Sequence, residues 1–253
     1  MEENTLLRIE NVSKQFPGVL ALDNVCLNLK EGEILGICGE NGAGKSTLMK
    51  ILSGNMRGAY EGDIYYENRK VKISSVEVAE KLGIEMVYQE VNMMFDASVA
   101  ENLFVGKLPG KYIVDYKKLY SDTADLLKMA QIDATPKQKV SKLNNGQLQM
   151  LSILRAWSKK PRILVLDEPT GALTTNEVHI LMDMLRDLKK KGISCIYISH
   201  KLEEIFEITD RVVVLRDGKT VAEHKTDGVP ENVLIEEMVG RKIENEYFRV
   251  IFV

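Results

Sequence analysis

A short glycine-rich run near the N-terminus constrains the fold of this chain more than any other feature. Residues 39–47 match the pattern of Gly, four variable residues, Gly, Lys and Ser or Thr. The apolar residues 33–38 before the run favour a buried strand, and residues 48–54 after it favour a helix ended by a glycine. The sequence therefore predicts a strand, a loop and a helix in succession, which is the arrangement of an anion-binding loop.

Such a loop binds phosphate groups for two physical reasons. Its glycines allow positive φ angles that turn backbone N–H groups inward, and the helix N-terminus adds a partial positive charge. Lys45 is then expected to reach the β and γ phosphates of a nucleotide, and Ser46 is placed to bind magnesium. The alternative is a glycine turn that only begins a helix.

Composition sets limits on the class of protein. The chain has 253 residues, of which 45% are apolar, so it can bury a substantial core. Its net charge of −3 provides no domain-wide positive field, so we expect no nucleic-acid partner. No signal peptide or long apolar span is evident, which predicts a soluble protein. Cys26, Cys38 and Cys195 lack metal or disulfide spacing and are expected to be reduced core residues.

Hydrophobic patterns predict an α/β organisation. Short alternating runs at residues 6–16, 21–29 and 62–66 favour antiparallel strands, whereas residues 92–160 show helical spacing and resemble an insertion. Further on, strands at 163–166, 194–198 and 212–215 alternate with helices, which indicates a parallel sheet. The helix expected at residues 176–191 carries a capping box formed by Thr174 and Glu177.

Two adjacent carboxylates, Asp167 and Glu168, follow the apolar strand at residues 163–166. Strand alternation predicts that their side chains point in opposite directions and serve different roles. At the carboxyl end of a parallel strand, Asp167 is expected to hold magnesium and Glu168 to polarise an attacking water. An acidic pair at a strand end is by itself commonly a solvated turn.

A third motif makes a family resemblance specific. Residues 143–147 read Leu-Asn-Asn-Gly-Gln, and taken alone they fit a helix cap. Together with the phosphate loop and residues 167–170, they resemble the nucleotide-binding domain of ATP-binding cassette (ABC) transporters. This resemblance implies an α/β P-loop NTPase of ABC type, with a mixed sheet core, an N-terminal antiparallel β subdomain and an inserted α-helical subdomain.

The resemblance also implies a division of the chain and a set of site residues. Residues 1–253 would form a single domain, with an ATP-binding core at 1–91 and 161–227, a helical subdomain at 92–160 and a C-terminal helix and tail at 228–253. The implied catalytic residues are Glu168, His200, Gln89 and Lys45. The implied metal ligands are Ser46, Gln89 and Asp167. The implied ATP-binding residues are Phe16, Gly39, Glu40, Asn41, Gly42, Ala43, Gly44, Lys45, Ser46, Thr47, Asn144, Asn145, Gly146 and Gln147.

Three of these residues have a simpler interpretation when the family resemblance is set aside. Gln89 would be an ordinary polar loop residue, His200 a capping or hydrogen-bonded histidine, and Phe16 a core aromatic residue. The resemblance implies that Gln89 contacts magnesium and the attacking water, that His200 contacts the γ-phosphate, and that Phe16 stacks on adenine.

Several segments narrow the resemblance to the first cassette of bacterial monosaccharide importers of the ribose, xylose and galactose type. These segments are residues 39–47, 197–205, 215–218 and 238–241. The resemblance implies an ATPase that uses ATP and Mg²⁺ and powers sugar import by closing on a second cassette. The implied partners are that cassette, a transmembrane permease docked at the groove between the Gln89 loop and the helical insertion, and indirectly a sugar-binding protein. The implied location is cytoplasmic, on the inner face of the membrane.

The match departs from the family pattern in three places. Asn144 replaces the usual serine, Gly171 replaces a second serine, and residues 247–253 form an apolar tail where a polar linker is expected. We interpret that tail as the end of a truncated or frameshifted tandem cassette, with a natural terminal strand as the alternative. These departures leave open a low-turnover module that binds ATP and a partner. A soluble cassette ATPase of DNA repair or translation is a further alternative, without its expected coiled coil or zinc cysteines.

Overall fold

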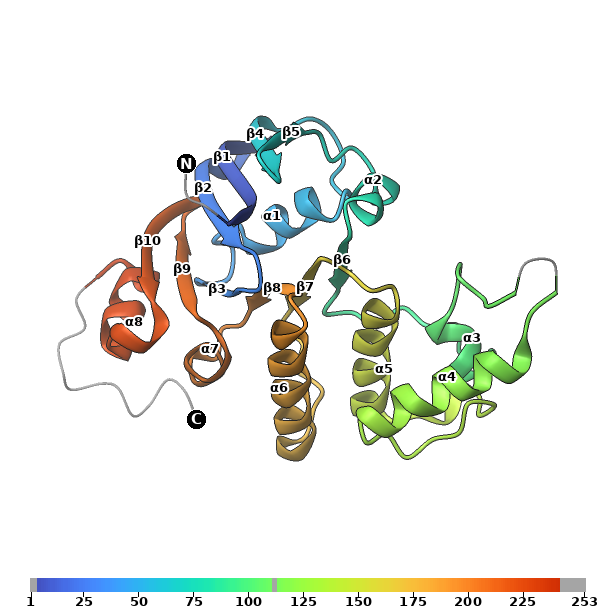
Figure 1. The fold of residues 1–253 in the computed structure, drawn as a ribbon. Coiled ribbons are helices and arrows are strands. Elements are labelled where there is room, and N and C mark those ends of the chain that lie inside the picture. The colour runs from blue at the N-terminus through green and yellow to red at the C-terminus, as the bar shows by residue number, and fades with distance from the viewer. Residues whose placement is uncertain (1–3, 111–112, 242–253) are drawn as a thin grey trace.

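The computed structural model describes residues 4–110 and 113–241. The N-terminal part forms an antiparallel sheet with the strand order β2-β1-β4-β5 (Figure 1). Its strands are β1 (Thr5–Phe16), β2 (Val19–Lys30), β4 (Glu61–Tyr66) and β5 (Arg69–Val71). The antiparallel strands expected in this part of the sequence are therefore confirmed.

A second, six-stranded sheet has the order β10-β9-β3-β8-β7-β6. Its strands are β3 (Ile34–Cys38), β6 (Ile84–Val87), β7 (Ile163–Asp167), β8 (Ser194–Ile198), β9 (Arg211–Arg216) and β10 (Lys219–Lys225). All neighbours pair in parallel except β10, which is antiparallel to β9. This mixed sheet agrees with the predicted fold class. Its parallel strands end at one common edge.

Helices cover both faces of the mixed sheet and extend to one side of it (Figure 1). They are α1 (Lys45–Leu52), α2 (Val76–Lys81), α3 (Val99–Leu103), α4 (Tyr116–Met129), α5 (Asn145–Ser158), α6 (Thr175–Lys190), α7 (Leu202–Ile208) and α8 (Glu231–Val239). Short 3₁₀ turns occur at Val140–Lys142 and Thr226–Gly228. The elements α3, α4 and α5 form the helical region expected within residues 92–160, and the expected tail at residues 247–253 lies outside the described residues.

Strand alternation in the mixed sheet divides the core into two layers. Along β7, Ile163 and Val165 pack with α1 and the antiparallel sheet, whereas Leu164 and Leu166 pack with α5 and α6. All four side chains are fully buried, as expected for a central strand covered on both faces. Because β7 lies between β8 and β6, the carboxylates that follow it lie next to the carboxyl ends of those two strands.

The capping box predicted for the long helix after β7 is present. The Thr174 side chain accepts a hydrogen bond from the backbone N–H of Glu177, and the Glu177 carboxylate accepts one from the backbone N–H of Thr174. The helix ends at Lys190, and Gly192 follows with a φ of 78°. The start and end of α6 therefore follow from local sequence signals.

One expectation about the core is wrong. Cys38 and Cys195 are buried, but Cys26 is exposed. Cys26 lies on β2 between the buried residues Val25 and Leu27, so alternation turns its side chain to the opposite, solvent-exposed face. Apolar neighbours in the sequence therefore did not indicate burial. Across the described ranges, no helix has both the length and the apolar character needed to cross a membrane.

Candidate functional site

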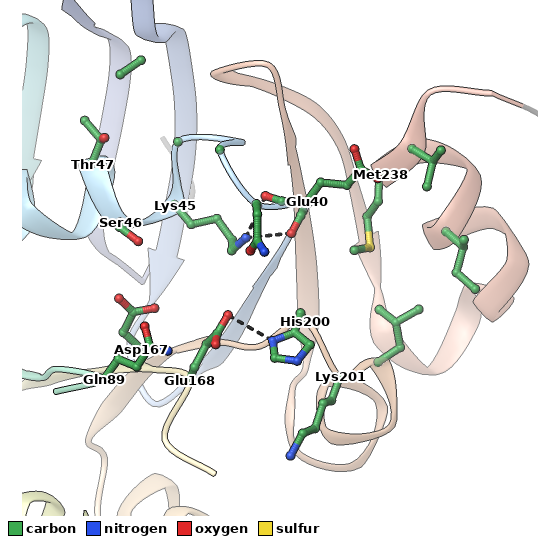
Figure 2. Close-up of a pocket in the computed structure, with 18 of the residues that line it drawn as sticks. Glu40, Lys45, Ser46, Thr47, Gln89, Asp167, Glu168, His200, Lys201 and Met238 are labelled. Carbon is green, nitrogen blue, oxygen red and sulfur yellow. Dashed lines mark hydrogen bonds and ion pairs between the residues drawn. The ribbon is translucent and has the colours of Figure 1, made fainter. Parts of the chain in front are cut away.

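The glycine-rich loop joins β3 to α1 at the carboxyl edge of the mixed sheet (Figure 2). Gly39 and Gly44 adopt φ angles of 155° and 102°. A Cβ atom on Gly39 would collide with the carbonyl oxygen of Leu215, and one on Gly44 would lie 2.7 Å from the carbonyl oxygen of Ala21. Glycine is therefore required at both positions by the backbone conformation and by close packing.

Lys45 begins α1, and its side chain turns back over the loop. Its Nζ donates hydrogen bonds to the carbonyl oxygens of Gly39 at 2.7 Å and Glu40 at 3.0 Å (Figure 2). Burial lowers the pKa of Lys45, while the nearby charges of Glu168 and Asp167 act in the opposite direction. The ammonium group is thus held above the loop by two carbonyl oxygens. Phosphate oxygens could take their place as hydrogen-bond acceptors.

Asp167 and Glu168 both line the cavity beside this loop, so the expectation that they point in opposite directions is wrong. The reason is the backbone at Glu168, which leaves the extended conformation and adopts a φ of 45°. The two side chains nevertheless have different surroundings (Figure 2). The pKa of Asp167 is raised, first by burial and then by repulsion from Glu168.

His200 pairs with Glu168. The Nδ1 atom of His200 lies 3.0 Å from Oε1 of Glu168, and the histidine follows the carboxyl end of β8 (Figure 2). The backbone N–H of Glu168 also donates to the carbonyl oxygen of Ile198 on β8. Gln89 follows β6 and lines the same cavity. Three parallel strands therefore bring these side chains together, as expected for ligand sites in such sheets.

The cavity has a volume of about 1340 Å³. It contains most of the predicted site residues: Gly39, Glu40, Asn41, Gly42, Gly44, Lys45, Ser46, Thr47, Gln89, Asp167, Glu168 and His200. Ala43 belongs to the same loop but is buried against Leu48 and the antiparallel sheet. The cavity combines a backbone cradle for anions, one buried ammonium group and two carboxylates, which suits a phosphorylated ligand and a cation.

The donor set fits magnesium. Ser46, Gln89 and Asp167 present hydroxyl, amide and carboxylate oxygens to the same cavity. Mg²⁺ prefers oxygen ligands and is commonly held by one or two carboxylates together with substrate phosphates and water. Within the described ranges, no cluster of three or more His, Cys, Asp or Glu side chains suited to a metal is found. These residues therefore fit a cation that also needs ligands from a nucleotide.

The predicted residues Asn144, Asn145, Gly146 and Gln147 are not among those lining this cavity. They lie at the start of α5, where the Asn144 side chain accepts a hydrogen bond from the N–H of Gln147 at 2.8 Å. The Gln147 side chain in turn accepts one from the N–H of Asn144 at 3.1 Å. The plain capping interpretation of this motif is therefore correct for the isolated chain.

Phe16 is likewise not among the cavity residues. It lies at the end of β1 with 38% of its surface exposed, and the Nζ atom of Lys14 lies 5.1 Å from its ring centre. Val19 and Leu20, at the start of β2, line the cavity instead. No motif marks these two residues, whose exposed apolar side chains line the cavity together with the phosphate loop.

Helix α8 forms another wall of the cavity that sequence reasoning missed. Its residues Glu231, Ile235, Met238 and Val239 line the cavity, and Figure 2 labels Met238 on this wall. The helix is fixed by a hydrogen bond of 2.6 Å from Arg216 to the Glu237 carbonyl group. Residues 238–241 contributed to the family resemblance, but they gave no indication of a cavity wall, because that depends on how α8 packs on β9.

The fold and this cavity define a P-loop domain of the ATP-binding-cassette type. The profile of the family described as "ABC transporter" matches residues 22–171. The chain belongs to this family, which confirms the resemblance inferred from the motifs.

Relatives with curated descriptions are sugar importer subunits. The chain is 50% identical over 246 residues to the xylose import ATP-binding protein XylG of Thermoanaerobacter pseudethanolicus, covering 96% of this chain and 49% of that protein. It is 43% identical to the galactose/methyl galactoside import ATP-binding protein MglA of Clostridium perfringens, covering 97% and 48%. The chain therefore spans about half the length of the curated relatives it matches.

Solved structures share the fold. An ATP-binding cassette of an ABC transporter, MJ1267, has a TM-score of 0.83 and 27% identity, covering 96% of this chain and all of the solved one. A bacterial ABC transporter cassette, MJ0796, solved as a dimer, has a TM-score of 0.77 and 28% identity, covering 88% and 100%. These similarities confirm the predicted fold class.

Proposed function

We propose that this chain binds Mg-ATP in the cavity and hydrolyses it. The observation that carries the proposal is the convergence of the phosphate loop, Asp167, Glu168, Gln89 and His200 on one cavity. These parts supply what phosphoryl transfer needs, namely phosphate binding, charge neutralisation and a group that orients water. The solved relative MJ1267, an ATP-binding cassette described in its ADP conformation, supports the same ligand class.

The residues then take distinct roles. Lys45 exchanges its bonds to the Gly39 and Glu40 carbonyl groups for bonds to the β and γ phosphates. Ser46, Asp167 and Gln89 would hold magnesium, which would supply neutralisation of the phosphate charge. Glu168 orients or deprotonates the attacking water, and His200, paired to it at 3.0 Å, stabilises the γ-phosphate.

A complete site requires a second cassette. Because residues 144–147 are not among those lining the cavity of their own chain, they are free to contact the γ-phosphate held by a partner cassette. That partner is a second copy of this chain or another cassette module. The dimer printed for the solved relative MJ0796 supports this arrangement. ATP-driven closing and reopening of the two cassettes would supply the mechanical step.

The role we propose for that step is import of a sugar, with a monosaccharide as its class. The description of XylG and MglA as import ATP-binding proteins supports this role. The chain would act at the cytoplasmic face of the membrane by docking to a permease. A sugar-binding protein would deliver the sugar to that permease. The exposed apolar side chains Met94 and Phe95, just after Gln89, support a docking groove there. The boundaries between the ATP-binding core, the helical subdomain and the C-terminal part, at residues 91–92, 160–161 and 227–228, belong to the same proposal. The proposal includes no nucleic-acid partner.

The replacement Glu168→Gln tests the proposal. It preserves the size of the side chain but removes the charge that orients or deprotonates water, and general-base groups contribute about 10²–10⁴-fold to rates. We expect ATP affinity within about 3-fold of the wild-type value, because catalysis and not binding is impaired. ATP turnover is expected to fall by at least about 100-fold. Calorimetry and a phosphate-release assay measure the two quantities.

Two further variants frame this result. Lys45→Ala should weaken ATP binding by about 10–100-fold, the effect of losing charge-assisted hydrogen bonds. Glu61→Gln, at an exposed position that does not line the cavity, should behave like the wild-type chain. Unchanged turnover in Glu168→Gln would remove Glu168 from the catalytic role, and wild-type ATP affinity in Lys45→Ala would contradict the assignment of the phosphate loop.

The alternative of a low-turnover binding and assembly module is not favoured. It rested on Asn144 and on chain length, whereas the curated relatives considered above are import ATP-binding proteins. A flat, zero ATPase rate at every protein concentration is the result that would revive it.

A further inference from the structure

Glu204 is a buried carboxylate to which the proposed ATP site assigns no role. It lies on α7 with 7% of its surface exposed. Its Oε1 atom accepts a hydrogen bond from the Thr170 hydroxyl at 2.6 Å and lies 3.2 Å from the Lys201 ammonium group. Its Oε2 atom accepts hydrogen bonds from the Tyr197 hydroxyl at 2.8 Å and the Ser199 hydroxyl at 2.9 Å. A single carboxylate thus gathers side chains from two segments of the chain, the one that follows β7 and the one that leads from β8 into α7.

Both segments carry residues that we assign to catalysis. Thr170 follows Glu168 by two residues, and Ser199 directly precedes His200. Glu204 therefore connects the segment that holds Glu168 with the segment that holds His200. The pair itself is closed at 3.0 Å between Nδ1 of His200 and Oε1 of Glu168, and His200 is otherwise largely exposed.

The surroundings keep the Glu204 carboxylate ionised. Burial acts to raise its pKa, but the hydrogen bonds from Thr170, Tyr197 and Ser199 and the charge of Lys201 outweigh burial, so the pKa lies below its usual value. A charged acceptor makes these hydrogen bonds stronger and more directional than a neutral one would. The connection between the two segments is therefore a stiff one.

We propose that Glu204 is a positioning residue that holds the Glu168–His200 pair in its reactive geometry by fixing Thr170 and Ser199. This inference rests on the proposed hydrolysis of ATP. Small displacements of reacting groups cost about 10²-fold in rate, and more than half of the His200 side chain is exposed, so fixing the adjacent Ser199 would limit the displacement of His200. Glu204 itself touches neither ATP nor the attacking water in this proposal.

The test is Glu204→Gln in the 253-residue chain. Glutamine has the same size but offers one oxygen acceptor where the carboxylate offers two. We expect kcat to fall by about 10-fold or more, with KM for ATP within about 2-fold of the wild-type value. Glu207→Gln is the matched control, because Glu207 lies on the same helix and forms an exposed pair with Arg186. It should leave both constants unchanged.

A second readout does not depend on ATP hydrolysis. The chain has three histidines, so the imidazole signals can be followed by NMR in the nucleotide-free protein. In Glu204→Gln the signals of His200 should shift, whereas those of the exposed His179 should stay in place. A role confined to stability would lower the melting temperature without moving the His200 signals or kcat, and that result would overturn the proposal.

Two single-hydroxyl variants decide the matter even if Glu204→Gln does not fold. Ser199→Ala and Thr170→Val each remove one hydrogen bond to the carboxylate, and each should lower kcat with little effect on KM. Unchanged kcat in both variants would contradict the proposal. An inactive wild-type chain would contradict the proposed hydrolysis instead, and the NMR comparison would still show whether Glu204 positions His200.

Discussion

At the scale of single residues, the site contains charges that the fold does not favour. Asp167 and Glu168 lie side by side at the end of β7, and burial followed by repulsion from Glu168 raises the pKa of Asp167. Lys45 is also buried, which lowers its pKa. Residues that would bind a polyanion and a cation are thus held ready at a cost in stability.

This cost leads to a prediction for Asp167→Asn. A carboxyl with a raised pKa in the folded state stabilises the fold below its unfolded pKa, near 3.8, and loses this contribution as pH rises through the folded pKa. At pH 7 the wild-type protein therefore lacks it, and the neutral variant should melt at a higher temperature without nucleotide. Each kcal/mol regained corresponds to roughly 2–4 °C, and the difference should shrink as the pH is lowered towards 4.

Thermal unfolding at several pH values measures this effect. Asp125→Asn, an exposed position on α4, is the control and should show no such trend. The same Asp167→Asn protein should bind Mg-ATP more weakly, because it lacks the carboxylate that we propose as a metal ligand. A melting temperature at pH 7 equal to or below that of the wild-type protein would contradict the assigned strain.

At the scale of helices and strands, local sequence determines the helix caps. The capping boxes of α5 and α6 each lie within four consecutive residues, and both form in the structure. The cap of α5 also bears on the proposed nucleotide binding, because Asn144 replaces the serine that is usual in this motif. Its carboxamide accepts the N–H of Gln147, which a bound phosphate would otherwise attract.

Substitutions at Asn144 separate capping from nucleotide binding. Asn144→Ala should lower the free energy of unfolding by about 1 kcal/mol, because the N–H groups of the first turn lose their acceptor. Asn144→Ser restores an N-cap hydroxyl and should remain within a few tenths of a kcal/mol of the wild-type value. Urea unfolding measures both values. Equal stability of the alanine and serine variants would show that the cap does not stabilise α5.

At the scale of the whole molecule, the proposed reaction needs two cassettes. The phosphate loop and residues 144–147 lie on one chain, but the latter are not among the residues lining its cavity. Mixing two inactive variants tests this arrangement. Lys45→Ala lacks nucleotide binding, and Asn144→Asp keeps the helix cap but places a negative charge where the partner's γ-phosphate would bind.

We expect each variant alone to have a low ATPase rate and the mixture to regain part of it. A mixed dimer has one intact site, formed by the phosphate loop of the Asn144→Asp chain and the Asn144 of the Lys45→Ala chain. The wild-type rate per chain should also rise with protein concentration in the dilute range. A mixture no more active than its components, together with a rate per chain independent of concentration, would indicate a site complete within one chain.

Features that depend on neighbours along the chain could be predicted from the sequence. The glycine spacing of residues 39–47, the position of Lys45 and the helix caps at Asn144 and Thr174 all arise within a few residues, so local sterics and hydrogen bonding specify them. Gln89 and His200 came from the family resemblance rather than from any local pattern. Their assigned roles remain predictions.

Only the tertiary structure decided which distant residues meet. The parallel order of β6, β7 and β8 brings Gln89, Glu168 and His200 to one edge of the sheet, and the turn at Glu168 places it beside Asp167 against strand alternation. The wall formed by α8 and the burial of Glu204 likewise depend on packing between segments far apart in the chain. The physical reason is that burial and convergence are set by non-local contacts, whereas loop and cap geometry are set by the backbone of consecutive residues.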